Sequence, residues 1–128
     1  MTDDEILYGP RKSPEVMRLL DRMALEVNTK IRQRGIARGF VCVQEAFNEK
    51  ILHCEMLVYK ASKETNDPRR RSRYISDTIM ELQEISVIIR FMLKNKALTI
   101  GEVGVISKYK KDITSQLYRW LKSADSED

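Results

Sequence analysis

The sequence has few residues suited to metal, thiol or disulfide chemistry. It contains two cysteines and one histidine in 128 residues. Cys42 and Cys54 are about 18 Å apart along the axis of one expected helix, so they cannot form a disulfide with each other, and we expect both to be small core or boundary residues. A zinc site needs three or four ligands, and the Glu-x-x-His pair of di-iron bundles is absent. We therefore expect no metal and no cofactor.

Residue patterns of known catalytic sites are also missing. The sequence has no P-loop, dinucleotide fingerprint or nucleophile motif. His53 has Glu49 one helical turn before it, and we expect it to be a surface or boundary residue. Glu81 and Glu84 form a carboxylate pair only in sequence, and helix surfaces carry such pairs routinely. We expect a protein that is not an enzyme.

Turn-forming residues and long apolar runs are scarce as well. Only 5 glycines and 3 prolines are present, which argues against a sandwich or barrel with many turns. No apolar run exceeds four residues, far below the length of a membrane span, so no membrane partner is expected. The first five residues, Met1 to Glu5, are acidic and lack a signal-peptide profile. The expected location is the cytoplasm.

Positive charge is abundant and unevenly placed. The formal net charge is +4, and all 23 Lys and Arg lie between Arg11 and Lys122. Six of the 19 acids lie outside that span, which leaves 13 within it and a net charge of +10. Such a basic body suits a polyanion such as RNA or DNA. The alternative is a charged helical surface without a polyanion partner.

Apolar residues recur at helical spacing in four segments, each long enough for a helix of roughly 30 Å. The segments cover residues 13–34, 40–62, 68–94 and 99–123. In the second segment, Leu52 and Leu57 widen the apolar stripe, as expected for a bundle helix with more than one neighbour. In the fourth, Trp120 falls on the stripe, and we expect it in the core. The stripes are Val16, Leu19, Leu20, Met23, Val27 and Ile31; Phe40, Val43, Phe47, Ile51, Cys54, Val58 and Ala61; Ile75, Ile79, Leu82, Ile85, Ile89, Met92 and Leu93; and Val103, Ile106, Ile113, Leu117 and Leu121.

Capping residues mark where these helices start. Ser13 and Pro14 suit the start of the first, and Asp67-Pro68 the start of the third. Thr99 and Glu102 form a capping box for the fourth. Short connections, among them the turn with Gly35 and Gly39, make neighbouring helices antiparallel. The sequence thus predicts an all-α, antiparallel up-down-up-down four-helix bundle over residues 13–123, after a flexible acidic segment (1–12) and before an acidic tail (124–128).

Two basic clusters stand out as candidate nucleic-acid-binding residues. The first basic cluster, at the end of the first helix, is Lys30, Arg32, Arg34 and Arg38; the second, at the start of the third helix, is Arg69, Arg70, Arg71 and Arg73. The topology places them at opposite ends of the bundle. Cations suit a helix C-terminus, so the first cluster also has a structural explanation, together with Lys94 and Lys96. At a helix N-terminus they oppose the dipole, which favours a binding role for the second.

Arg90 interrupts an otherwise apolar stretch, Val87 to Leu93. A charge in this position needs a partner or an interface, or it extends from a boundary position to solvent. Its candidate role is in an oligomer or partner interface.

The sequence resembles a known family of proteins. The resemblance lies in the stretch around Arg90, the short turn after it, and the capped last helix with its end at Leu117-Tyr118-Arg119-Trp120-Leu121-Lys122-Ser123. That family is the four-helix-bundle family of 23S rRNA intervening-sequence proteins, and within it the accessory variability determinants of diversity-generating retroelements. The resemblance covers about residues 14–123, and its specific motifs are Arg90 and Trp120 with Lys122.

The resemblance implies a small, non-enzymatic accessory protein. Such a protein forms a pentameric barrel, binds nucleic acid (RNA, DNA or both) and associates with the reverse transcriptase of the element during mutagenic cDNA synthesis. A homo-oligomer is therefore expected, pentameric by resemblance. The alternative is a structural oligomer of the intervening-sequence type with no nucleic-acid role.

Overall fold

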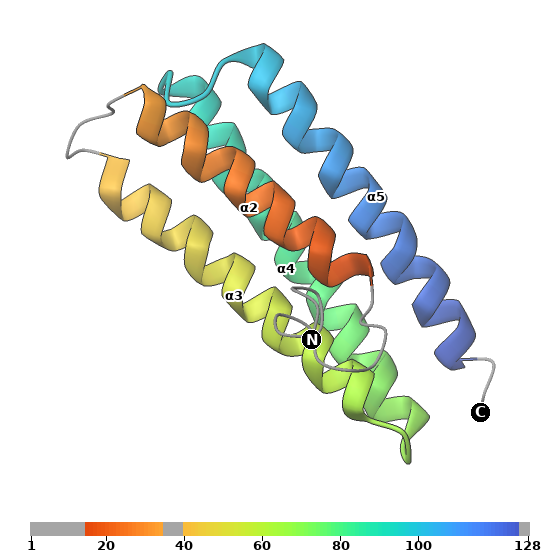
Figure 1. Cartoon of the computed structure of the whole chain (residues 1–128). Coiled ribbons are helices and arrows are strands. Elements are labelled where there is room, and N and C mark those ends of the chain that lie inside the picture. Colours follow the sequence, from red (N-terminus) through yellow and green to blue (C-terminus); the bar gives the residue numbers. More distant parts are fainter. Residues whose placement is uncertain (1–14, 35–39, 126–128) are drawn as a thin grey trace, which may run out of the picture.

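The computed structural model describes residues 15–34 and 40–125, and over these residues it contains four helices. They are α2 (Glu15–Gln33), α3 (Val41–Lys63), α4 (Pro68–Lys94) and α5 (Ile100–Asp125). Figure 1 shows them as four long rods lying side by side. The expected limits agree to within two residues at each end that lies inside the described ranges. Predictions that concern Ser13, Pro14, Gly35, Arg38, Gly39 and the terminal segments 1–12 and 126–128 fall outside these ranges.

The helices form a closed ring of neighbours. Each packs against the next along the chain, and α5 packs back against α2, with the largest interface between α3 and α4. Within the described ranges, α2 makes no close backbone contact with α4, nor α3 with α5, so these pairs lie across the ring from each other. Consecutive helices run in opposite directions (Figure 1). The predicted all-α, antiparallel four-helix bundle is confirmed.

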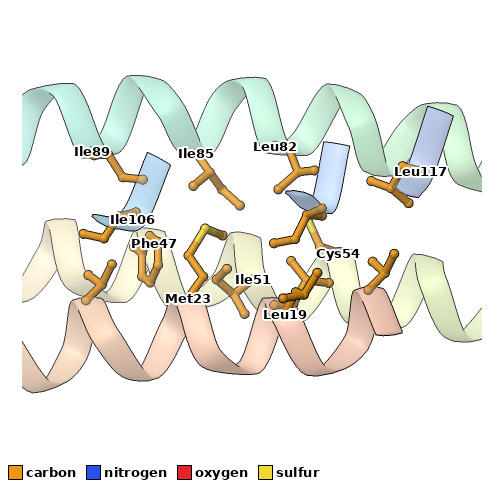
Figure 2. Close-up of a cluster of buried hydrophobic side chains, with 14 of the residues drawn as sticks. Leu19, Met23, Phe47, Ile51, Cys54, Leu82, Ile85, Ile89, Ile106 and Leu117 are labelled. Atoms are coloured by element: carbon orange, nitrogen blue, oxygen red, sulfur yellow. The ribbon is translucent and has the colours of Figure 1, made fainter. Parts of the chain in front are cut away.

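One apolar core runs through the ring. It contains Val16, Leu19, Leu20, Met23, Val27 and Ile31 of α2; Phe47, Ile51, Cys54, Val58 and Ala61 of α3; Ile75, Ile79, Leu82, Ile85, Ile89 and Met92 of α4; and Ile106, Ile113 and Leu117 of α5. Figure 2 shows labelled members from all four helices pointing inward. At about 25 cal/mol per Å² of buried apolar surface, this burial is the dominant force that holds the bundle together.

The predicted stripes are correct in outline, but some of their residues lie at the edge of the core: Phe40, Val43, Leu93, Val103 and Leu121 are half-buried. Leu57 is buried, as expected, but Leu52 is 59% exposed, so the stripe of α3 widens on one side only. Cys54 lies in the core, whereas Cys42 is exposed. The reason is rotation about the helix: Cys54 is seven residues after the fully buried Phe47, whereas Cys42 precedes it by five and lies on another face. Trp120 is half-buried and packs against the core rather than within it.

The two expected helix starts are formed by the predicted caps. Asp67 Oδ1 accepts hydrogen bonds from the backbone N–H groups of Arg69 (3.1 Å) and Arg70 (3.2 Å). At the start of α5, the backbone N–H of Thr99 donates to Glu102 Oε1 at 2.8 Å, and that of Glu102 donates to Thr99 Oγ1 at 3.2 Å. The capping box is therefore complete, and it fixes the residue at which α5 begins.

The turn between α4 and α5 is tight because one residue adopts a left-handed backbone conformation. Lys96 has a φ of 65°, and the N–H of the next residue, Ala97, donates to Met92 O at 2.8 Å. This geometry satisfies carbonyls at the end of α4 that have no partner within the helix. It also buries Ala97 and Leu98, so α5 returns directly along α4.

Candidate nucleic-acid interface

The first basic cluster lies where α2 ends, beside the α4–α5 turn. Arg34 Nη1 donates to Ala97 O at 2.7 Å, and Nη2 lies 2.8 Å from the carboxylate of Glu102. Arg34 therefore connects the end of α2 to the start of α5. Lys30 is half-buried and Arg32 is exposed. The binding role of Lys30, Arg32 and Arg34 stays a prediction, and for Arg34 the fold supplies an intramolecular role as well.

The second basic cluster occupies the first turns of α4, next to the end of α3. Arg69 and Arg73 are exposed. Arg70 Nη1 lies 3.6 Å from Glu64 Oε2, and because the Arg70 side chain is exposed this ion pair is weak. Arg71 is half-buried. This cluster is at the opposite end of the bundle from Arg34, as the topology predicted, so the two clusters do not form one patch.

A third basic region, the α4–α5 groove, joins residues far apart in the sequence. It has a volume of about 730 Å³ and receives Arg90 from α4 and Lys110, Lys111 and Arg119 from α5. Not one of the described side chains that line it is acidic. A concave surface lined by charge of one sign concentrates its field and attracts counter-ions. The groove is thus the strongest candidate for an anion site in the described part of the chain.

Small and apolar side chains give the groove its shape. Ser86 and Ser107, one from each helix, line it together with Ile89, Leu93 and Val103. A serine side chain is short, so these positions leave space between the two helices unfilled. The groove therefore combines an apolar base with cationic side chains, whose long stems can lie along apolar surface while their charged ends reach solvent.

Tyr118 adds an aromatic ring to the wall of the groove and is 52% exposed. It follows Leu117, which is fully buried, so the same turn of α5 that anchors the helix in the core presents the ring outward. One turn earlier, Thr114 Oγ1 donates to Lys110 O at 2.8 Å. This local bond uses the hydroxyl hydrogen of Thr114 within the helix. The cations and Tyr118, together with the exposed residues Ser107 and Ser115, are the groups able to contact a ligand.

Sequence reasoning misses most of this groove. It identifies Arg90, but as an interface residue, and Arg90 is exposed. It gives no role to Lys110, Lys111 or Arg119. The signal available in the sequence is the basic and aromatic composition of Lys108 to Arg119, but the pairing of this face with Arg90 depends on the register between two antiparallel helices.

The carboxylate pair Glu81 and Glu84 lies in a mixed-charge cluster between α3 and α4. Lys50 Nζ is 3.2 Å from Glu81 Oε2 and also forms an ion pair with Glu84, while His53 Nδ1 lies 3.2 Å from Glu81 Oε2. Partial burial opposes ionisation of Glu81, but the hydrogen bonds from His53 and Lys50 prevail and lower its pKa. The exposure expected of His53 is confirmed. Here the lysine is paired with two carboxylates, in contrast to the α4–α5 groove, whose described lining has no acid.

Two further titratable groups lie close to the core. Burial raises the pKa of the Cys54 thiol to about 12, so this cysteine stays protonated and is a poor nucleophile. Partial burial, a hydrogen bond that the protonated carboxyl of Glu55 donates to Asp21, and the negative charge of Asp21 raise the pKa of Glu55 to about 8. Asp21 is on α2 and Glu55 on α3, so a carboxyl pair spans the interface between these helices.

Over residues 15–34 and 40–125, no group of three or more His, Cys, Asp or Glu side chains is placed to hold a metal ion. None of the four helices is both long enough and apolar enough to cross a membrane.

Comparisons with known proteins give the chain no relatives. No family model, no curated protein and no solved structure matches it. A functional assignment therefore has to come from the residues themselves, and the α4–α5 groove is their most distinctive arrangement.

Proposed function

We propose that this protein is a non-enzymatic, cytoplasmic nucleic-acid-binding protein that contacts the phosphate backbone of RNA or DNA. The observation that carries the proposal is the α4–α5 groove, where four cations from two helices gather around one concavity without an acidic neighbour among the described lining residues. Phosphate oxygens are the ligands that Arg and Lys side chains meet most often on nucleic acids. The exposed Arg69 and Arg73 of the second cluster supply further contacts at one end of the bundle.

Binding of this kind draws its free energy mainly from counterion release. Each neutralised phosphate frees condensed cations, so affinity falls steeply as the salt concentration rises. Backbone contacts carry no base information. We therefore expect little sequence preference and a strong dependence on ionic strength.

We further propose that the protein acts as a homo-oligomer. Large apolar side chains on the outer faces of α3 and α4 support this, because a helix buried only within its own bundle has no need of them: Leu52, Met56, Met80, Val87 and Phe91 are all exposed. Five subunits, and a role beside the reverse transcriptase of a diversity-generating retroelement, are what the sequence resemblance implies. Co-purification with the product of a neighbouring reverse-transcriptase gene tests the association with a reverse transcriptase.

The competing proposal is a structural oligomer that does not bind nucleic acid. The same apolar side chains would support it, but it gives no reason for the charge of the α4–α5 groove. A gel-shift titration with single-stranded and duplex oligonucleotides, at low and at moderate salt, separates the two. Binding at low salt that weakens strongly at moderate salt supports the nucleic-acid proposal, and absence of binding at low salt refutes it and favours the structural oligomer.

A further inference from the structure

We propose that the α4–α5 groove binds nucleic acid as an unpaired single strand, with a base stacked on Tyr118. This inference rests on the proposed function and specifies the form of nucleic acid that the groove accepts. Its basis is the side-by-side placement of cations, an apolar base and an exposed aromatic ring in one concavity.

A surface that bound phosphates by charge alone would need only the cations. In the groove, however, the apolar side chains of Ile89, Leu93 and Val103 share the lining with the cations. Apolar surface adds nothing to the affinity for phosphates, because these are fully hydrated anions. It does add to the affinity for the flat faces of bases. The two kinds of side chain together match a ligand that is charged along one edge and flat and weakly polar along the other.

A single strand has both properties, whereas a duplex presents only the first to such a groove. In duplex DNA the base faces are stacked on one another, and only base edges are accessible in the grooves. Proteins that bind single strands combine a basic channel with aromatic side chains on which bases stack. Tyr118 is half-exposed in the wall of the groove, next to Arg119 and one helical turn from Ser115, and can accept a base without rearrangement of the core.

The length of the groove agrees with this ligand. Its residues on α5 extend from Val103 to Arg119, roughly 24 Å along a helix axis. Lys110 and Lys111 lie near the middle, and Arg119 lies at the end that carries Tyr118. A strand that follows the groove would therefore meet cations along its path and the aromatic ring at one end.

The test uses fluorescence anisotropy with one labelled mixed-sequence DNA strand of about 20 nucleotides, longer than a typical single-domain site, alone and annealed to its complement. We expect the single strand to bind the wild-type protein roughly tenfold more tightly than the duplex. Tyr118→Leu removes the ring and keeps an apolar side chain at an exposed position, so folding should be unaffected. Loss of one stacked base, worth about 1–3 kcal/mol, should weaken single-strand binding by a factor of about 5 to 150 and leave duplex binding unchanged.

Tyr59→Leu is the matched control. Tyr59 is also an exposed tyrosine, 58% accessible, with Lys63 Nζ 5.6 Å from its ring centroid, but it lies on α3, across the bundle from α5. It should bind both probes as the wild type does. Equal affinity for strand and duplex, or an unchanged single-strand affinity in Tyr118→Leu, overturns this inference and leaves backbone binding standing. Failure of the wild type to bind either probe at low salt overturns both proposals.

Discussion

Arg34 and Glu102 connect the end of α2 to the start of α5, with Arg34 Nη2 2.8 Å from the Glu102 carboxylate. The same carboxylate accepts from the backbone N–H of Thr99 in the capping box of α5. One acidic side chain therefore both caps its own helix and holds a neighbouring one. The contact closes the ring of helices at the end where α2 stops and α4 turns into α5.

This contact should make the stability of the bundle depend on acidic pH. The hydrogen bond from Arg34 lowers the pKa of Glu102 to about 2, below the value near 4.3 that a free glutamate has. A carboxyl group with a lowered pKa stabilises the folded state above its unfolded pKa, and this contribution is lost as the pH falls towards 2. In thermal unfolding followed by circular dichroism, Glu102→Gln should melt below the wild type at pH 7, and the difference should shrink between pH 4.5 and pH 2. A difference that is the same at every pH would show that the charge of Glu102 plays no part.

The left-handed backbone conformation of Lys96 should lower the free energy of unfolding, and a glycine at this position should restore part of that loss. A non-glycine residue with a φ of 65° pays roughly 1–2 kcal/mol for the position of its Cβ, and glycine loses part of that gain through its flexible unfolded state. We expect Lys96→Gly to raise the free energy of unfolding by about 0.5–1 kcal/mol, as measured by urea denaturation. Lys96→Ala is the control, because it removes the same charge and keeps the Cβ. A gain in both variants would mean that the lysine charge, not the backbone, is the source.

The carboxyl pair of Asp21 and Glu55 should affect the stability of the bundle at neutral and alkaline pH rather than at acidic pH. The raised pKa of Glu55, about 8, means that the folded state favours the protonated acid. Its contribution to stability is present below the unfolded pKa, near 4.3, and is lost as the pH rises through about 8. Glu55→Gln imitates the protonated form. The melting temperature of this variant, relative to that of the wild type, should therefore rise by a few degrees between pH 5 and pH 9. Because Glu55 is partly solvated, the gain should be small. Parallel pH profiles for the two proteins would contradict the pairing.

Much of the fold was predictable because the helix starts and the apolar faces depend on residues that are close together in the sequence. Asp67 with Pro68, and Thr99 with Glu102, fix the starts of α4 and α5 through contacts within one turn, and such contacts are visible in a sequence of a few residues. The apolar stripes followed from helical spacing. What the spacing could not decide was which side of a wide stripe faces a neighbour: Leu52 and Leu57 are both leucines on α3, yet only Leu57 is buried.

The candidate site was less predictable than the fold. Arg90 and Lys110 are twenty residues apart on different helices, and their meeting depends on how far the α4–α5 turn shifts one helix along the other. That shift is set by the backbone of Lys96 and by the burial of Ala97 and Leu98, none of which has a marked signature in the sequence. The two basic clusters are visible in the sequence because their residues are nearly contiguous, whereas the groove is assembled only in three dimensions.

The most direct measurement of the central claim is the salt dependence of nucleic-acid affinity in a variant with a neutral groove. Arg90, Lys110, Lys111 and Arg119 are replaced by Gln, and binding of a labelled single strand is followed by anisotropy over a series of salt concentrations. The control replaces four exposed cations outside the groove and the two basic clusters, namely Arg22, Lys60, Lys63 and Lys122, and so carries the same net charge.

The account predicts that the groove variant binds on the order of tenfold or more weakly, and that its slope of log K against log salt is flatter by roughly 0.7 for each phosphate that no longer meets a cation. The control should keep a slope close to that of the wild type. An equal decrease of affinity and slope in the two variants would show that net charge alone drives binding, and would contradict the assignment of the α4–α5 groove as the nucleic-acid site.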